Sequence, residues 1–295
     1  MIKIVSGFST PVGSIIALVN LCNALNARGH RCALYGPDNW HVDKCTAARL
    51  SDFYPEHGDI IIVHNINLVS FTELYRLQEK REEPGHTKRL ISLKSTFMRY
   101  FAGWRRDVDV KLILSCQEND RFPIRRLNHA LFDRIHYVHA SQINYHKIGR
   151  RHFVCPNFQT PLVPSEYKPD GSAGVIGSIR RENKTDEAIE SALLSGMKTV
   201  TLYGYLVDPI YYYKRIVPLV AKYPGRIRYA GFIDDRQCIY DTLSDVFCSV
   251  DQAWSMVKME CEQTNTRYHG PNTVPAEELI TSDEIFDVWK RELAL

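Results

Sequence analysis

Apolar residues along the chain alternate between short continuous runs and longer segments with helical spacing. A helical segment over 14–28 places Ile15, Leu18 and Cys22 on one face and stops at Gly29. Its alternation with apolar runs is typical of a parallel sheet wrapped by helices. The runs that we interpret as strands in this half are 2–5, 31–35, 60–64, 90–93, 111–116 and 134–139.

A second series of the same kind follows a segment rich in proline and glycine, 160–171, which we interpret as a linker. Two such series predict an α/β protein with two doubly wound Rossmann-like domains that face each other across a cleft. We expect these domains at 1–160 and 161–280, followed by a C-terminal helix at 281–295. The second series has strands at 173–177, 199–203, 227–230 and 246–250, helices at 185–194, 211–222 and 237–243, and a helix from Met256. Thr185 is expected to cap the first of these helices.

The last helix has a clear predicted start. Thr281 and Glu284 have the spacing of a capping box, in which each side chain bonds the backbone N–H of the other. Ile285, Trp289 and Leu293 then recur on one face of the helix.

Composition adds limits without changing this picture. The chain has 295 residues, 44% hydrophobic and 24% charged, which is ordinary for a globular protein of two domains. A formal net charge of +3 is too small to indicate nucleic acid as a partner. Basic residues nevertheless cluster within 76–106 and 121–151, where they can meet phosphates or an anionic membrane surface, or simply form solvated helix faces.

Cysteine usage and hydropathy bear on localisation. The 8 cysteines include no C-x-x-C pair, which favours reduced thiols in a cytoplasmic protein over a zinc site. The start of the chain is typical of a strand entering a glycine loop and not of a signal peptide. Without an apolar run of roughly 18 residues, any membrane association is expected to be peripheral.

The most informative motif lies between Ser249 and Glu260. Gln252 and Glu260 are eight positions apart, or about 12 Å along a helix, so they can grip two ends of one extended ligand. The N–H groups at the helix start would face an anion. This geometry suits a nucleoside diphosphate joined to another group, although an ordinary strand-loop-helix with a surface glutamate has the same pattern.

This segment resembles the signature S-x-x-E-G-F-G-x-x-x-x-E-A of the retaining, family 4-like GT-B glycosyltransferases. Ser249 and Glu260 match it, while Gln252 stands at the first glutamate of the E-x7-E pair and Ala253-Trp254-Ser255 replaces Gly-Phe-Gly. The resemblance spans nearly the whole chain. Other matching segments are the glycine loop 7–13, Gly29-His30, Cys155-Pro156-Asn157-Phe158, 175–184 (V-G-R-L-x-x-x-K-G in the family), 231–234 and 244–249.

The resemblance implies a glycosyltransferase that moves a hexose from a nucleotide-sugar donor to an acceptor hydroxyl, with retention, in glycan or glycolipid biosynthesis. Cationic side chains and a helix dipole would balance the donor diphosphate, so neither a metal nor a cofactor is expected. The implied catalytic residues are Gln252, Arg180 and Lys184. The implied donor-binding residues are Ser178, Arg181, Gly231, Ile233, Trp254, Ser255, Met256, Val257 and Glu260, with Glu260 on the ribose and backbone groups near Ile233 on the nucleobase. The implied acceptor-binding residues are Gly7, Ser9, Gly13, His64 and Lys94.

Two departures from the family keep other functions open. Gln252 can hydrogen-bond a sugar but cannot stabilise a developing cation as a glutamate does. Lys94 lies where the family usually has a histidine. A non-catalytic nucleotide-sugar-binding subunit is therefore an alternative, and an epimerase on the same architecture is a further one. The sequence does not specify the sugar, the nucleobase, the acceptor or the oligomeric state.

Overall fold

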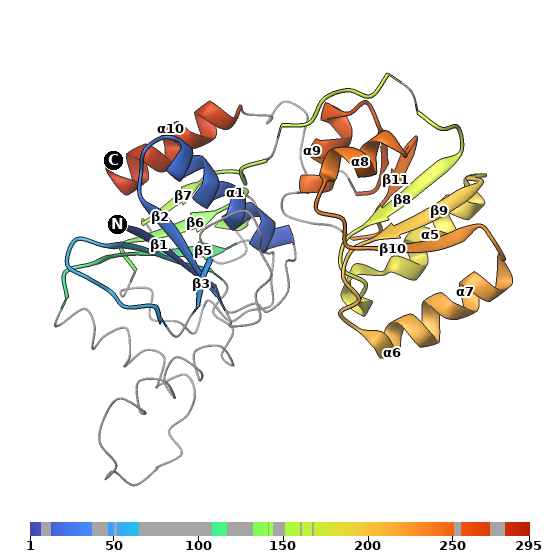
Figure 1. Ribbon diagram of the computed structural model, residues 1–295, viewed down its shortest axis with the longest axis horizontal. Coiled ribbons are helices and arrows are strands. Elements are labelled where there is room, and N and C mark those ends of the chain that lie inside the picture. Colours follow the sequence, from blue (N-terminus) through green and yellow to red (C-terminus); the bar gives the residue numbers. More distant parts are fainter. Residues whose placement is uncertain are drawn as a thin grey trace, which may run out of the picture. The chain divides into compact units, whose positions relative to one another are not determined.

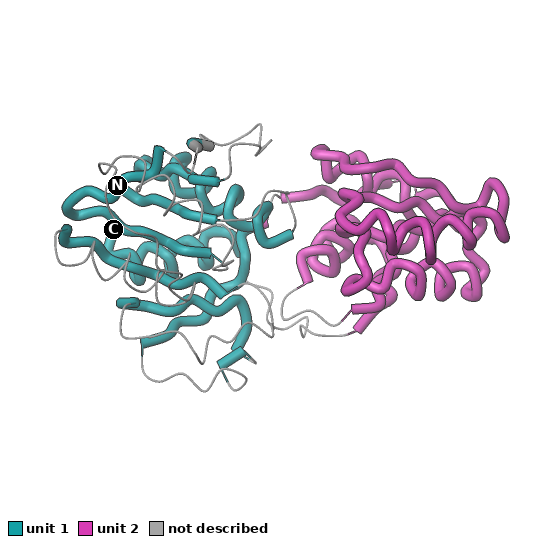
Figure 2. Tube along the Cα trace, turned by 90° about the horizontal axis from the view of Figure 1, so that it is seen from below, with its two compact units in different colours: residues 1–158, 280–295 teal, residues 159–279 magenta. Residues whose placement is uncertain are grey.

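The computed structural model consists of two compact units (Figure 2). Unit 1 comprises Met1–Phe158 and Ile280–Leu295, and unit 2 comprises Gln159–Leu279. The last helix therefore belongs to unit 1, so the chain enters this unit twice. The structure describes residues 1–6, 13–36, 47–49, 52–64, 108–116, 132–140, 142–143, 151–159, 161–166, 168–250, 255–271 and 281–295.

Unit 1 is built on a parallel sheet of seven described strands in the order β3-β2-β1-β4-β5-β6-β7. Most of its residues are buried, which explains the continuous apolar runs in the sequence. The short strands β3 and β7 were not predicted, and the expected strand at 90–93 lies outside the described residues. The strands are β1 (Ile2–Ser6), β2 (Cys32–Gly36), β3 (Ala47–Arg49), β4 (Ile60–His64), β5 (Lys111–Cys116), β6 (Arg134–Tyr137) and β7 (His152–Val154).

Two helices from opposite ends of the chain, α1 (Gly13–Ala27) and α10 (Ser282–Leu293), pack on the same core of this sheet (Figure 1). Trp289 of α10 is buried there and meets the ring of Phe153 in β7 edge to face, with centroids 5.2 Å apart. The predicted capping box is confirmed: Thr281 Oγ1 accepts a bond from Glu284 N (3.2 Å), and Glu284 Oε2 accepts one from Thr281 N (2.7 Å).

A row of buried polar residues crosses the sheet of unit 1. Ser6, His64, Ser115 and His136 are register partners on the neighbouring strands β1, β4, β5 and β6. Ser6 Oγ lies 3.1 Å from His64 Nδ1, and Ser115 Oγ lies 2.9 Å from His136 Nδ1. Burial lowers the pKa of His64 to about 3 and that of His136 to about 4, so both rings are neutral at pH 7.

Unit 2 is built on a parallel sheet of five described strands in the order β10-β9-β8-β11-β12. The predicted strands at 173–177, 199–203, 227–230 and 246–250 correspond to β8, β9, β10 and β11, whereas the short edge strand β12 was not predicted. The bounds are β8 (Ser172–Ile176), β9 (Thr199–Tyr203), β10 (Ile227–Gly231), β11 (Asp245–Phe247) and β12 (Arg267–His269).

The helices of unit 2 follow its strands in the expected alternation (Figure 1). A π-helical turn at 212–216 joins α6 to α7, and the predicted helix at 211–222 falls within this continuous segment. None of the described helices combines the length and hydrophobicity needed to cross a bilayer. The helices are α5 (Thr185–Leu194), α6 (Pro209–Tyr211), α7 (Val217–Lys222), α8 (Arg236–Asp241) and α9 (Met256–Gln263).

Candidate donor site in unit 2

Two glycines allow the loops after β8 and β9 to approach each other at the carboxyl edge of the sheet. Gly177 N donates to Tyr203 O at 2.8 Å. Gly204 has φ +146°, and a Cβ there would lie 2.0 Å from Gly177 O. Because no side chain fits this approach, glycine is required at position 204.

Asn183 holds the loop after β8 in shape. Its Nδ2 donates to Ser178 O (2.6 Å) and to Ser178 Oγ (3.0 Å), while its Oδ1 accepts a bond from Arg180 Nε (3.3 Å). Ser178 and Arg180, both predicted donor-site residues, are thus joined through a side chain that the sequence analysis assigned no role. The signal was present, since asparagine is a residue that bonds nearby backbone in turns.

The basic residues of this loop precede α5. Arg180 is half-buried, whereas Arg181 and Lys184 are exposed. Lys184 occupies the N-cap position of α5 with φ 47°, and its Nζ lies 3.3 Å from Glu187 Oε2. The expectation that Thr185 caps this helix is wrong: Thr185 is already the first helical residue, because the left-handed turn at Lys184 starts the helix one position earlier.

A small cavity lies where the loops after β8 and β11 meet the start of α5. These two strands are neighbours in the sheet, so their carboxyl ends lie together. The cavity holds about 40 Å³, enough for a group of the size of one water, far less than the 300–1,000 Å³ typical of ligand pockets. It is lined by Val175, Ile176, Gly177, Ser178, Asn183, Thr185, Ala188, Phe247, Cys248, Ser249 and Val250.

The start of α9 is capped by a predicted donor-site residue. Ser255 is the N-cap, and its Oγ accepts a bond from Lys258 N at 3.2 Å. Met256 and Val257, in the first turn, are half-buried. Gln252 and Trp254 lie outside the described residues, so the structure says nothing of the hexose contact predicted for Gln252.

Glu260, on the second turn of α9, is buried in a hydrogen-bonded cluster. Arg236 Nε donates to Glu260 Oε1 (3.1 Å), Arg236 Nη2 donates to Glu260 Oε2, and Tyr240 Oη donates to Glu260 Oε2 (2.6 Å). A carboxylate has about four lone-pair sites. Three of these accept the bonds from Arg236 and Tyr240.

Arg236 is a residue that sequence reasoning missed. It and Tyr240 lie four positions apart on α8, so both side chains reach the same side of that helix. The contact with Glu260 joins positions 24 residues apart, and local patterns contain no information on such a pairing.

The turn predicted to meet the nucleobase follows β10. Gly231 has φ 77°, and Ile233 packs against a buried cluster that includes Tyr240 and Leu243. Between them, Phe232 stacks on Tyr205 from the loop after β9, with ring centroids 4.5 Å apart and an angle of 23°. An aromatic pair therefore lies beside the predicted base-binding turn.

The predicted acceptor residues belong to unit 1. Gly13 is the first residue of α1. His64 is fully buried against Ser6 in the polar row. Gly7, Ser9 and Lys94 lie outside the described residues, so the acceptor site stays a prediction.

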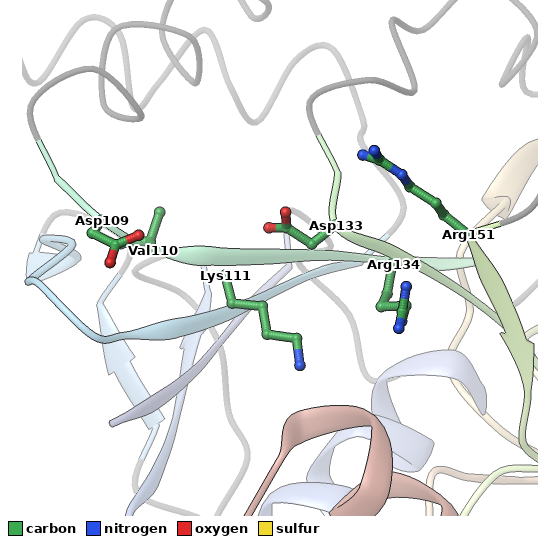
Figure 3. A pocket seen from close by; sticks show the side chains of 6 residues that line it. All are labelled: Asp109, Val110, Lys111, Asp133, Arg134 and Arg151. Atoms are coloured by element: carbon green, nitrogen blue, oxygen red, sulfur yellow. The ribbon is translucent and has the colours of Figure 1, made fainter.

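A larger cavity of about 520 Å³ lies at the amino ends of β5, β6 and β7 in unit 1 (Figure 3). Lys111 and Arg134 point toward α10, where they contact Glu292, while Asp133 and Arg151 point to the other side of the sheet (Figure 3). None of the predicted site residues lines this cavity. Ligands of open parallel sheets bind at the opposite, carboxyl ends of the strands.

Within the described ranges, no group of three or more His, Cys, Asp or Glu residues is arranged to hold a metal ion. The cationic groups at the candidate site are Arg180, Arg181, Lys184 and the amino end of α5, and the acidic residues of the same segment are Glu182, Asp186 and Glu187.

No protein-family model matches the sequence, and comparison with curated proteins gives no significant match. Solved structures do match. HepE of Anabaena in complex with UDP has a TM-score of 0.57 at 10% identity, over 99% of this chain and 91% of that one. A variant of S. aureus TarM in complex with fondaparinux, alpha-GlcNAc-glycerol and UDP has a TM-score of 0.62 at 8% identity, over 100% and 92%.

The pneumococcal O-GlcNAc transferase GtfA, in complex with UDP and GlcNAc, has a TM-score of 0.58 at 8% identity, over 99% of this chain and 91% of that one. At these identities the likeness establishes the fold. The chain has the GT-B fold, with two Rossmann-like α/β domains, as the sequence predicted.

Proposed function

We propose that this protein is a glycosyltransferase that uses a nucleotide-sugar donor, and that unit 2 binds the donor. The observation that carries the proposal is the meeting of two loops and the start of α5 at the carboxyl ends of β8 and β11, beside three cationic side chains. Support comes from the fold, since structures that share it include complexes with UDP and UDP-glucose.

The proposed chemistry is transfer of a hexose with retention. The bond between the sugar's anomeric carbon and the donor diphosphate breaks, and a bond to the acceptor oxygen forms on the same face. The acceptor proton leaves with the diphosphate. Arg180, Arg181 and Lys184, with the amino end of α5, would stabilise the negative charge that develops on the departing oxygen. We propose that these positive groups take the place of a metal ion.

The remaining donor contacts follow from the site. Glu260, held by Arg236, would accept a hydrogen bond from one ribose hydroxyl. The backbone of the turn at Gly231 and Ile233 would form hydrogen bonds with the base. Gln252 would contact the hexose. We propose an acceptor hydroxyl on a glycan or a lipid-linked glycan, bound by unit 1, in the cytoplasmic synthesis of a polysaccharide or glycolipid.

Donor binding is tested by thermal-shift measurements with UDP, GDP, ADP and CMP and their sugars. A nucleotide at a hundredfold excess over its dissociation constant adds about 2.7 kcal/mol of apparent stability. Lys184→Gln should lower the affinity, because Lys184 lies at the proposed diphosphate site. Lys198→Gln is the matched control. Lys198 is also exposed and forms an ion pair, with Asp170 at 3.0 Å, but it lies just before β9, at the amino ends of the strands and therefore away from the proposed site.

Turnover separates the proposed enzyme from a binding subunit. Release of UDP from a bound UDP-sugar, or transfer to an added acceptor, supports the transferase, and activity should persist in EDTA. Binding of the same nucleotide-sugar without any turnover would favour the non-catalytic subunit, as the glutamine at position 252 allows. Equal nucleotide affinity of the Lys184→Gln and Lys198→Gln variants would argue against the proposed site.

A further inference from the structure

The outer face of the helical segment 209–222 in unit 2 exposes large apolar side chains. Among the described residues, ten large hydrophobic side chains are exposed, and five of these lie between positions 207 and 229. Ile210 is 65% exposed and Tyr213 is 69% exposed. Apolar side chains that gather on one surface, unlike scattered ones, mark a site of interaction. Three of the five, Ile210, Tyr213 and Val217, belong to the helical segment. Val207 precedes this segment, and Tyr229 lies on β10 with its ring 5.8 Å from that of Tyr212.

The helical segment has a buried face in addition to its exposed one. Tyr211, Ile216 and Leu219 point inward and belong to the buried core of the unit. The inward face therefore accounts for the fold, and the outward apolar residues are not needed to hold the helix on the sheet. Figure 1 shows α6 and α7 along the lower margin of unit 2.

Basic residues flank the exposed apolar ones. Between positions 207 and 230 the sequence has five Lys or Arg and one Asp, an excess of four positive charges, compared with three for the whole chain. Arg215 is paired with the carboxylate of Asp186, whereas Lys214, Lys222 and Arg228 lie on the exposed surface. The cores of protein–protein interfaces are depleted in lysine. Apolar and aromatic residues bordered by lysine and arginine are instead typical of helices that lie in an anionic membrane surface.

The position of this surface fits such a role. The helix starts directly after the loop that follows β9, and Val207 N and Asp208 N donate to Ile179 O at 3.2 and 3.1 Å. Ile179 lies between Ser178 and Arg180 of the candidate donor site. The exposed start of the helix is therefore attached to the loop that carries the cationic residues of that site.

We propose that the outer face of helix 209–222 binds the surface of an anionic lipid bilayer, with Ile210, Tyr213 and Val217 inserted among the headgroups and Lys214 and Lys222 near the phosphates. This proposal does not rest on the proposed function, because vesicle binding requires no sugar donor. If both hold, the donor-binding unit would be attached to the lipid surface that carries a lipid-linked acceptor.

The test is flotation of the full chain with vesicles of 70% phosphatidylcholine and 30% phosphatidylglycerol, with pure phosphatidylcholine as the reference. Binding to the anionic vesicles, weakened by added salt, is expected. Ile210→Ser/Tyr213→Ser/Val217→Ser should abolish it, and each of Lys214→Gln and Lys222→Gln should lower the partition coefficient about fivefold.

The matched control changes exposed apolar residues elsewhere, Tyr54→Ser/Val163→Ser/Leu194→Ser, and should bind as the unaltered protein does. Absence of binding to anionic vesicles, or equal loss in both triple variants, would overturn the proposal. Sedimentation velocity measures whether the protein forms a dimer. A dimer that the helix variant alone dissociates, with no vesicle binding, would mean that this face binds a second copy of the chain instead. Because all substituted side chains are exposed, circular dichroism should show folded variants.

Discussion

The two units bury polar groups in different ways, although both are parallel sheets wrapped by helices. Toward the carboxyl ends of its strands, unit 1 buries neutral pairs, Ser6 with His64 and Ser115 with His136. Unit 2 buries carboxylates paired with arginine: Asp186 with Arg215, Asp245 with Arg267, and Glu260 with Arg236. Unit 1 also has an ion pair, Lys3 with Asp59, at the amino end of its sheet.

The same architecture can therefore be sensitive to acid or resistant to it. A neutral buried histidine resists protonation, whereas an ion-paired carboxylate resists neutralisation. The units are therefore expected to lose stability in separate pH ranges, and substitutions can test each kind of burial in turn.

The largest effect is expected on lowering the pH from 7.5 to 5. The pKa values of His64 and His136 are lowered by burial to about 3 and about 4, from about 6.5 when unfolded. The contribution of the two neutral histidines to the free energy of unfolding is complete above pH 6.5 and is lost as pH falls from there to about 3. At pH 5 the loss is about 2 kcal/mol for each histidine. Hydrogen exchange should show peptides of β4 and β6 losing protection while those of β8 and β9 keep it.

The control for this experiment is the variant His64→Gln/His136→Gln, whose unit 1 stability should change less between the two pH values. Unit 2 should respond at lower pH. Burial raises the pKa of Asp245, but Arg267 and the other hydrogen-bond partners outweigh burial and lower this pKa to about 2. The contribution of Asp245 to the free energy of unfolding is therefore lost as pH falls from about 4 to 2. If unit 2 loses protection first at pH 5, the comparison is wrong.

Breaking one buried pair of unit 2 should have the next largest effect. Arg236→Met leaves the Glu260 carboxylate buried without its cation, at a cost of about 3 kcal/mol or more. The double variant Arg236→Met/Glu260→Met removes both charges and should recover most of that loss. Urea denaturation of the three proteins measures it. A double variant as unstable as the single one would show that the charges are not the cause.

Gly204→Ala should destabilise unit 2 by about 2 kcal/mol, because the added methyl group meets the carbonyl oxygen of Gly177. It should also weaken nucleotide binding, since the loop with Ser178 must move. Gly225→Ala is the matched control, with φ 75° but no atom within 4 Å of the added Cβ. Thermal denaturation of both variants is measured with and without UDP. Equal effects would mean that the contact with Gly177 is not the cause of the loss.

The smallest effect is expected in unit 1, where Thr281→Ala removes the cap of α10 and should cost about 1 kcal/mol. Thr281→Ser keeps the hydroxyl and should cost little. The measurement is the thermal midpoint at pH 7.5, where the histidines remain neutral. A loss of the same size in both variants would mean that packing, and not capping, determines the effect.

The sequence predicted the features that depend on local pattern. Buried strands such as β4 and β5 are continuous apolar runs, and the capping box at Thr281 is a spacing of three residues. The three-residue strands β3, β7 and β12 were missed because three residues are too few to show a pattern, whereas β11, of the same length, overlaps the longer predicted run 246–250. Thr185 was assigned the wrong position because the left-handed turn at Lys184 is a property of the folded loop.

The candidate site was predicted in part for the same reason. The cationic loop at 180–184 and the cap at Ser255 follow from motifs of adjacent residues. The clamp on Glu260 depends on Arg236, and the burial of His64 depends on strand register. Both are tertiary relationships that bring together distant positions, so a single sequence contains no direct signal of them.

The return of α10 to the first unit also constrains the order in which the protein matures on the ribosome. Ile285, Phe286, Trp289 and Leu293 complete a core whose other buried members come from the first 160 residues. Unit 2 is continuous and can close as soon as its own strands emerge. The unit that is translated first thus acquires its full interior last, and until then its α1 side exposes apolar surface that a chaperone can bind.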